Sequence, residues 1–430
     1  MHSKDKRLFV GDFRSEKQKK ILFLEDMSRS FVLTFILLFA TVLLPAQKVH
    51  QVISEVKTSA DLQTGADQTE KYIPLLKGRS VALVANQTSM IGKKNLADTL
   101  LALKITIKKI FFPEHGFRGN EDNGEVLKSY KDKKTGLTCI SLYGKENKKP
   151  KAADLKDVDI VVFDLQDVGV RFYTYISTLH YVMEACAENK KKLIILDRPD
   201  PNGYYVDGPI MEEKYRSFVG LHPVPIVHGM TIGEYAQMID GEGWLNNKIK
   251  CDLQVIPCQK YSHSDYYELP VKPSPNLPDM ASVYLYPSLC LFEGTMVSVG
   301  RGTDKPFECF GYPNMPNATY TFTPHPVKGA SADPPYNGKE CRGYDVSVYG
   351  NMYMKYSRQL YLYWIIKTYQ SAPDKANFFN PYFLNLTGTD ELEQQIKDGK
   401  SEEEIHKSWE PGLKKFKEIR KKYLLYKDFE

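Results

Sequence analysis

The chain contains 430 residues, of which 42% are hydrophobic and 26% charged, a composition typical of a soluble globular protein with room for two domain cores. Residues 1–46 hold eight basic and five acidic residues; without them 50 basic residues face 48 acidic ones, so the net charge falls from +5 to +2. A nearly neutral body argues against a nucleic-acid partner.

The N-terminal region predicts export. An uncharged apolar segment runs from Phe31 to Leu44. It has the length of a signal-peptide core and is shorter than the ~20 residues of a membrane span. We interpret Met27–Ala46 as a cleaved signal peptide, residues 1–26 as an over-long start assignment and 47–70 as a linker. The alternative is an uncleaved membrane anchor behind a cytoplasmic tail. In both cases the body lies outside the cytoplasm, and the periplasm is the expected compartment.

The next part of the chain alternates apolar runs with helical stretches. Runs rich in Val, Ile, Leu and Phe predict strands, and the stretches between them predict helices. The strands are expected at 80–87, 107–114, 137–144, 159–167, 192–200 and 224–229, and the helices at 94–104, 174–191 and 231–239. Strands that are apolar throughout are typical of a parallel sheet with helices on both faces. We therefore predict a doubly wound α/β domain over residues 71–262.

The pattern of the sequence changes after Tyr261, where the alternation of apolar runs and helical stretches ends. A proline-rich stretch at 268–280 marks a domain junction. Beyond it, the pattern predicts a strand at 343–350 and a helix at 354–370. A Ser-x-x-Glu capping box at Ser401 and Glu404 precedes a basic amphipathic terminal helix at 413–426, whose charges we assign to a solvated face. Residues 263–430 are thus expected to form a smaller α+β domain that contributes to the cleft.

Motifs for metals and common cofactors are missing from the sequence. The seven cysteines include no C-x-x-C pair, and there is no H-E-x-x-H, G-x-G-x-x-G, P-loop or G-x-S-x-G motif. Cys251 and Cys258 flank a short apolar run and could pair, although we do not predict a disulfide. No cofactor and no metal site are predicted.

Polar residues follow five of the predicted strands. In open α/β sheets, ligands bind beyond the carboxyl ends of the strands, so these side chains are expected to line one cleft. The candidates for substrate contact are Asn86, His115, Gln166, Arg171, Tyr173, Arg198 and His228.

Glu114 is the first candidate for catalysis. It follows an apolar strand and is surrounded in sequence by Phe111, Phe112 and Phe117. An apolar setting raises the pKa of a carboxyl group, which suits a general acid at neutral pH. The alternative is a helix cap or an ion pair with Arg118.

The roles of three neighbouring candidates are left open. His115 is equally suited to substrate contact and to a structural hydrogen bond. Glu125 is a second carboxylate on the same loop, which is either catalytic or a cap. Asp167, at the end of another predicted strand, is a further catalytic candidate.

A second stretch, rich in glycine and polar residues, predicts an anion-binding site. Ser298, Arg301 and Thr303 lie in a turn that also contains Gly300 and Gly302. Such a turn offers backbone N–H groups and one guanidinium to a phosphate or a carboxylate.

Eight ordered segments resemble the exo-β-N-acetylmuramidase family typified by NamZ. The resemblance extends from Val81 to Tyr426, and one small variation is Asp200, where Asn is expected. The segments are VANQTS, FFPEHGFRG, FDLQDVGVRFYTYI, LDRPDPNG, GPIM with SFVGLHPVPIVHGMTIGEYA, PSPNLP, YPSLCLFEGTMVSVGRGTDKPFE and RKKYLLY.

The resemblance implies a Rossmann-like N-terminal domain joined to a smaller C-terminal domain. It also implies release of terminal N-acetylmuramic acid from the non-reducing ends of peptidoglycan glycans, with Glu114 as the catalytic residue. The lactyl carboxylate of that sugar is a natural ligand for Arg301, with Arg171 as the second candidate. Two other hypotheses stay open: an exported, non-catalytic muropeptide-binding protein, and an exported metal-dependent esterase or phosphohydrolase.

Overall fold

The computed structural model describes residues 62–119, 129–144 and 148–430. The predicted signal peptide, residues 1–26 before it and Glu125 lie outside the described ranges. In the described ranges, no helix is both long enough and apolar enough to cross a membrane.

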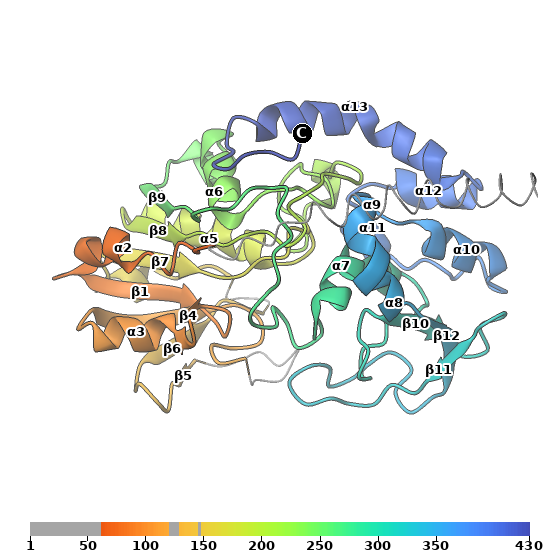
Figure 1. The fold of residues 1–430 in the computed structure, drawn as a ribbon, viewed down its shortest axis with the longest axis horizontal. Coiled ribbons are helices and arrows are strands. Elements are labelled where there is room, and N and C mark those ends of the chain that lie inside the picture. Colours follow the sequence, from red (N-terminus) through yellow and green to blue (C-terminus); the bar gives the residue numbers. More distant parts are fainter. Residues whose placement is uncertain (1–61, 120–128, 145–147) are drawn as a thin grey trace, which may run out of the picture. The chain divides into compact units, whose positions relative to one another are not determined.

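A seven-stranded sheet forms the N-terminal domain (Figure 1). All neighbouring strands in it are parallel except the edge pair β5–β6. In spatial order, its strands are β5 (Tyr130–Lys131), β6 (Thr138–Ser141), β4 (Thr106–Phe112), β1 (Ser80–Ala85), β7 (Ile160–Asp164), β8 (Lys192–Leu196) and β9 (Leu253–Ile256). A separate two-stranded hairpin pairs β2 (Met90–Ile91) with β3 (Lys94–Asn95). The predicted α/β fold with a mainly parallel sheet is confirmed.

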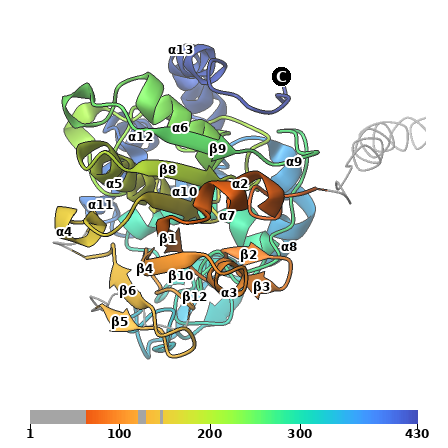
Figure 2. The same ribbon diagram turned by 90° about the vertical axis from the view of Figure 1, so that its left-hand side faces the viewer.

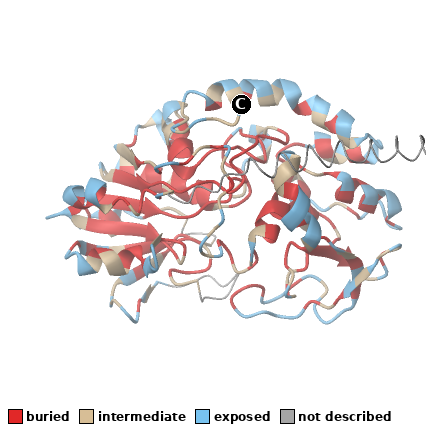
Figure 3. Cartoon of the chain, in the orientation of Figure 1, coloured by how far each residue is buried: buried red, intermediate tan, exposed pale blue. Residues whose placement is uncertain are grey.

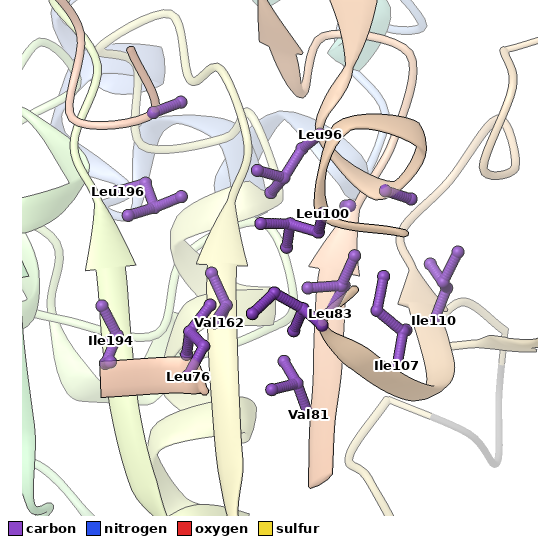
Figure 4. Close-up of a cluster of buried hydrophobic side chains, with 14 of the residues drawn as sticks. Leu76, Val81, Leu83, Leu96, Leu100, Ile107, Ile110, Val162, Ile194 and Leu196 are labelled. Atoms are coloured by element: carbon purple, nitrogen blue, oxygen red, sulfur yellow. The ribbon is translucent and has the colours of Figure 1, made fainter. Parts of the chain in front are cut away.

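Helices cover both faces of this sheet because its strands are apolar on both sides. Alternate residues of β1 pack with α2 (Thr69–Leu76) and α3 (Leu96–Ala102) in one buried cluster, where Figure 4 shows Leu76, Leu96 and Leu100 beside the strands. Two further helices pack against the sheet: α5 (Tyr175–Glu188) contacts β8, and α6 (Ile232–Gly241) contacts β8 and β9. Figure 3 shows the central strands β1, β7 and β8 as almost entirely buried.

The C-terminal domain is smaller and contains an antiparallel sheet, as predicted for an α+β domain. Its strands lie in the order β10 (Cys309–Tyr312), β12 (Cys341–Asp345) and β11 (Tyr320–Phe322). Figure 2 turns the molecule so that the N-terminal sheet faces the viewer, with β10 and β12 behind it. The helices are α7 (Met280–Leu289), α8 (Ser347–Tyr349), α9 (Lys355–Ser357), α10 (Tyr363–Ser371), α11 (Tyr382–Thr387), α12 (Glu391–Lys397) and α13 (Glu402–Arg420). Three short elements belong to the N-terminal domain: α4 (Ala152–Leu155) and the 3-10 turns Glu213–Tyr215 and Asn246–Lys248. The C-terminal domain also contains the 3-10 turn Cys290–Gly294 and the π-helical turn Gly350–Met354.

Before the terminal helix, three predicted elements differ from the structure in type or continuity. Residues 224–229 form no strand, since Val227 makes only isolated bridges with Val170 and Asp207, and β9 holds the edge of the sheet instead. The strand predicted at 343–350 ends at Asp345, whose carboxylate accepts hydrogen bonds from the backbone and hydroxyl of Ser347 and so starts a helical segment. The helix predicted at 354–370 is interrupted by residues 358–362, because residue 358 has a φ of 50°.

The terminal helix starts directly after the predicted capping box, before the predicted residue 413, and ends before the predicted residue 426. The capping box at Ser401 and Glu404 is present, but α13 spans Glu402–Arg420 and not 413–426. Arg420 is fully buried, where it donates to the carbonyl of Gly229 and pairs with Asp428 at 2.8 Å. The prediction that the basic charges here form a solvated face is therefore wrong for this residue. All seven cysteines are free thiols, so Cys251 and Cys258 do not pair.

Candidate active site

A cavity of about 610 Å³ is lined by side chains from both domains. The N-terminal domain contributes Glu114 and Tyr143, and the C-terminal domain contributes Glu293 and Arg301. A smaller cavity of about 70 Å³ shares Glu114 and Arg301 with it and extends toward His115 and Tyr173. The two cavities form one candidate site centred on Glu114.

Strand β4 and the turn after it position Glu114 at the cavity. The strand ends at Phe112, and the chain then turns through three residues in the left-handed region: His115 with a φ of 73°, Gly116 with 78° and Gly119 with 72°. Glycine adopts such angles freely, and histidine is among the residues that tolerate them best. The turn leaves the Glu114 carboxyl facing the cavity.

Burial raises the pKa of Glu114 above its ordinary value, and the negative charge of Glu293 acts in the same direction. A hydrogen bond with Tyr143 and the positive charge of Arg301 oppose this shift. The neutral, proton-carrying form of Glu114 is thus favoured at a higher pH than for an exposed glutamate. Arg118 pairs with Asp98 and Asp132, so the alternative of an ion pair between Arg118 and Glu114 is wrong.

Glu293 is a second carboxylate in the cavity, and the sequence analysis missed it. Its Oε1 accepts from Nε of Arg301 at 2.5 Å, and its Oε2 accepts from Sγ of Cys290 at 3.4 Å. The Arg301 guanidinium also lies 5.0 Å from the ring centroid of Phe307. Its two terminal nitrogens have no hydrogen-bond partner among the residues that the structure describes, and the side chain is 24% exposed. They are free to bind an anion in the cavity.

The turn around Arg301 is held by its own hydroxyl groups. Ser298 Oγ accepts from the backbone N–H of Gly300 at 3.3 Å, and Thr303 Oγ1 donates to the carbonyl of Gly300 at 2.7 Å. Neither Ser298 nor Thr303 lines either cavity. Within the predicted anion turn, the structure thus separates one residue that faces the cavity from two that shape the backbone.

His115 and Tyr173 line the smaller cavity. Burial lowers the pKa of His115 to about 4, so its imidazole is neutral at physiological pH. Its Nε2 lies 3.2 Å from Ser274 Oγ, and its Nδ1 is buried without a hydrogen-bond partner in the described part of the chain. The Tyr173 hydroxyl donates to the carbonyl of Pro273 at 2.8 Å. His115 therefore makes one structural contact and keeps a second, buried ring nitrogen without a partner among the described residues.

Two family models match the chain over most of its length. They are described as exo-beta-N-acetylmuramidase NamZ, N-terminal, over residues 81–281, and exo-beta-N-acetylmuramidase NamZ, C-terminal, over residues 284–426. The chain belongs to the exo-β-N-acetylmuramidase NamZ family. The predicted resemblance to this family is confirmed.

A curated relative and two solved structures are similar to nearly the whole chain. The peptidoglycan β-N-acetylmuramidase NamZ of Bacillus subtilis (strain 168) is 39% identical over 392 residues, which cover 85% of this chain and 91% of the relative. One DUF1343 family protein from Bacteroides fragilis NCTC 9343 is 46% identical with a TM-score of 0.79, covering 86% of this chain and all of that one. Another from the same organism is 28% identical with a TM-score of 0.71, covering 85% of this chain and 99% of that one.

The candidate site takes its residues from both NamZ regions. Glu114 and Tyr143 belong to the N-terminal match, whereas Glu293 and Arg301 belong to the C-terminal match. The two matches adjoin within α7, whereas the sequence predicted a boundary at 262/263. Neither NamZ region holds the full set of cavity carboxylates alone.

Several strand-end residues that were predicted to line the cleft instead form ion pairs and hydrogen bonds with other buried groups. Arg198 pairs with Asp164 at 2.5 Å, and its Nη2 also donates to the carbonyl of Met90. Asn86 donates to the Tyr175 hydroxyl at 2.8 Å. These buried groups satisfy each other's hydrogen bonds, so they hold the strand ends in place and lie outside the cavity lining.

Gln166 and Asp167 also lie outside the cavity lining. Gln166 donates to the carbonyls of Asp167 and Pro199 at 2.9 and 2.7 Å. Burial raises the pKa of Asp167 to about 7, and its Oδ2 accepts from the backbone N–H of Gly169 at 2.7 Å. His228 is fully buried 3.9 Å from that carboxylate, and burial lowers its pKa to about 3. In this arrangement Asp167 and His228 lie next to each other, and neither lines the cavity.

Arg171 joins the two domains. Its guanidinium is fully buried and donates to four backbone carbonyls at 2.6 to 3.0 Å, those of Pro209, Val224, Leu386 and Thr387. These four donated bonds involve both terminal nitrogens, and Arg171 lines neither cavity, so in this structure the residue has a structural role. In the described residues, no group of three or more His, Cys, Asp or Glu side chains is arranged to hold a metal ion.

The Asp164–Arg198 pair should be important for stability. Asp164→Asn leaves the Arg198 guanidinium buried without a counter-charge, which should lower the free energy of unfolding by about 3–5 kcal/mol. Urea denaturation followed by circular dichroism measures the change. Asp157→Asn is the control, because Asp157 pairs with Lys109 but is 53% exposed, and it should cost less than about 1 kcal/mol. Equal losses in the two variants would contradict this assignment.

Proposed function

We propose that this protein is an exo-acting glycoside hydrolase that releases terminal N-acetylmuramic acid from the non-reducing end of peptidoglycan fragments during cell-wall turnover and recycling. One observation carries the proposal: a desolvated carboxyl group, Glu114, faces a cavity that also contains the Glu293–Arg301 ion pair. Glycosidic cleavage needs an acid on the leaving oxygen and a second group at the anomeric carbon. Membership of the NamZ family supports the same reaction.

Glu114 is the proposed general acid. Burial keeps its proton in place at a pH where an exposed glutamate is ionised, and the proton passes to the glycosidic oxygen as the bond breaks. Glu293 is the proposed second carboxylate. It lies in the same cavity, where its negative charge is suited to stabilise the positive charge that develops at the anomeric carbon. This proposal takes Glu293 as the second catalytic carboxylate in place of the sequence candidates Glu125 and Asp167.

The free side of the Arg301 guanidinium is the proposed partner of the lactyl carboxylate. N-Acetylmuramic acid differs from N-acetylglucosamine by this group, so the contact distinguishes the two sugars. The aromatic rings of Tyr143, Phe172 and Tyr286 line the same cavity and provide apolar faces for the sugar ring. No cofactor is part of the proposed reaction.

We also propose export. The apolar segment within Met27–Ala46 supports a signal peptide, and the proposed substrate lies outside the cytoplasm. The protein is then periplasmic if the segment is cleaved, or anchored facing outward if it is not. N-terminal sequencing of the protein from fractionated cells tests this proposal. A chain that begins after Ala46 supports cleavage, and a chain in the cytoplasmic fraction with an intact N-terminus contradicts export.

Release of a single sugar tests the proposed reaction. The purified protein should liberate free N-acetylmuramic acid from a disaccharide with that sugar at its non-reducing end, and it should cleave the disaccharide with N-acetylglucosamine at that end far more slowly. Mass spectrometry of the products measures both. Binding of the first disaccharide without any release would instead indicate a non-catalytic muropeptide-binding protein. Loss of activity on adding a chelator would indicate a metal-dependent reaction.

A further inference from the structure

A second cavity, of about 530 Å³, lies in the C-terminal domain and shares no residue with the candidate active site. It is bounded by β10, β12, α8 and α10, which Figure 1 labels on the side of the molecule away from β1. We call it the α10 groove and define it by Asn317, Tyr349, Tyr363, Trp364, Lys367 and Ser371. Nothing in the proposed reaction uses it.

Exposed aromatic rings form two walls of the α10 groove. Tyr349 is 48% exposed and Tyr363 is 47% exposed, whereas Trp364 is 8% exposed and forms the floor. The rings of Tyr349 and Trp364 are 5.8 Å apart and nearly perpendicular, at 85°. This corner offers ring faces to a flat apolar surface, such as the C–H face of a sugar.

The exposure of these rings is unusual for this chain. Ten large hydrophobic residues are exposed in the described ranges, and five of them lie between residues 348 and 363. A concentration of exposed apolar side chains marks an interaction site, because burial on binding is favourable. The remaining question is which kind of partner the patch fits.

Polar groups in the α10 groove favour an anionic and hydroxylated ligand. Tyr363, Lys367 and Ser371 recur every four residues along α10, so they lie on one face of the helix. The Lys367 ammonium lies 5.8 Å from the Tyr363 ring centroid and donates to Gln370, with no carboxylate at ion-pair distance among the described residues. The nearby carboxylate of Asp345 is already paired with Lys305. The free charge in the groove is therefore positive.

We propose that the α10 groove is a second, non-catalytic binding site for peptidoglycan glycan, in which sugar rings stack on Tyr349 and Tyr363 and an anionic substituent pairs with Lys367. The inference rests on the proposed action on peptidoglycan. An exo-acting enzyme finds its substrate only at chain ends, and a separate site that holds the insoluble polymer keeps the cavity close to those ends. Aromatic stacking with a single cation fits such a chain better than it fits a membrane, which would require several basic residues.

Binding to insoluble sacculi tests this site directly. The full-length chain with Glu114→Gln, which should slow hydrolysis strongly, is co-sedimented with purified sacculi. Adding Tyr349→Ala with Tyr363→Ala should weaken binding about tenfold. The matched control is Val348→Ala with Met352→Ala, because these residues are 65% and 72% exposed in the same segment but do not line the groove. The control should bind as tightly as its parent.

Three outcomes would overturn the proposal. The first is unchanged binding by the tyrosine variant, and the second is an equal loss in the tyrosine variant and the control, which would indicate apolar adhesion to lipid or protein. Lys367→Glu tests the same groove without removing an aromatic ring, and unchanged binding by this variant is the third. With Glu114 intact, the tyrosine variant should hydrolyse a soluble aryl glycoside of N-acetylmuramic acid as fast as the wild type. If the wild type itself fails on this substrate, the proposed function fails and not the groove.

Discussion

Glu114→Gln should lower kcat on the natural disaccharide about 10²- to 10⁴-fold while leaving the fold intact, because general acid catalysis contributes a factor of that size. Glutamine has nearly the same shape as glutamate but has no proton to give to the leaving oxygen. Steady-state kinetics of sugar release measures the loss, and circular dichroism checks the fold. Full activity of this variant on the disaccharide would remove Glu114 from the reaction.

The nature of the leaving group separates an acid from a nucleophile at this position. An acidic phenol leaves without much protonation, whereas a sugar hydroxyl needs it. Glu114→Gln should therefore lose far more activity on the disaccharide than on an activated aryl glycoside. Equal losses on both substrates would instead indicate that Glu114 acts at the anomeric carbon, for example as the nucleophile. Glu293 would then become the better candidate for the general acid.

The pH dependence of kcat/KM gives an independent check on Glu114. The general acid works only while protonated, so activity should fall as the pH rises through the pKa of Glu114, which burial raises above its ordinary value. The hydrogen bond with Tyr143 stabilises the ionised form and lowers this pKa. Tyr143→Phe should thus move the alkaline limb to higher pH. A shift to lower pH, or no shift, would contradict the assignment of that limb to Glu114.

Arg301→Ala should reduce kcat/KM on the muramic substrate about 10- to 150-fold, since a hydrogen bond to a charged group contributes about 1.5–3 kcal/mol. An N-acetylglucosaminide lacks the lactyl carboxylate, so its slower turnover should fall much less and the preference between the two substrates should narrow. Parallel kinetics on the two aryl glycosides measures this preference. Equal losses would mean that Arg301 is structural.

The ion pair with Glu293 complicates this substitution, because alanine also leaves the Glu293 carboxylate alone in the cavity. Arg301→Lys is the matched control. It keeps a positive charge beside Glu293 but loses the planar fork that binds a carboxylate with two parallel hydrogen bonds. If Arg301 recognises the lactyl group, the lysine variant should recover activity on the glucosaminide more fully than on the muramic substrate.

The sequence by itself determined the features that depend on local patterns. Continuous apolar runs predicted the parallel sheet, because a strand buried on both faces cannot alternate with polar residues. The position of Glu114 followed from the same logic, since it comes directly after β4 and lies among phenylalanines. The capping box at Ser401 and Glu404 was also readable, because its two hydrogen bonds join residues only three apart.

Only the tertiary structure decided which polar residues face the cavity. Arg171, Arg198 and Arg301 look alike in the sequence, yet the first donates to a carbonyl 215 residues away, the second is buried against Asp164, and the third keeps a free side in the cavity. Glu293 gave no local signal, because its importance comes from a cavity that joins segments distant in the chain. Burial and partner choice depend on non-local packing, and these two properties separate a structural charge from a catalytic one.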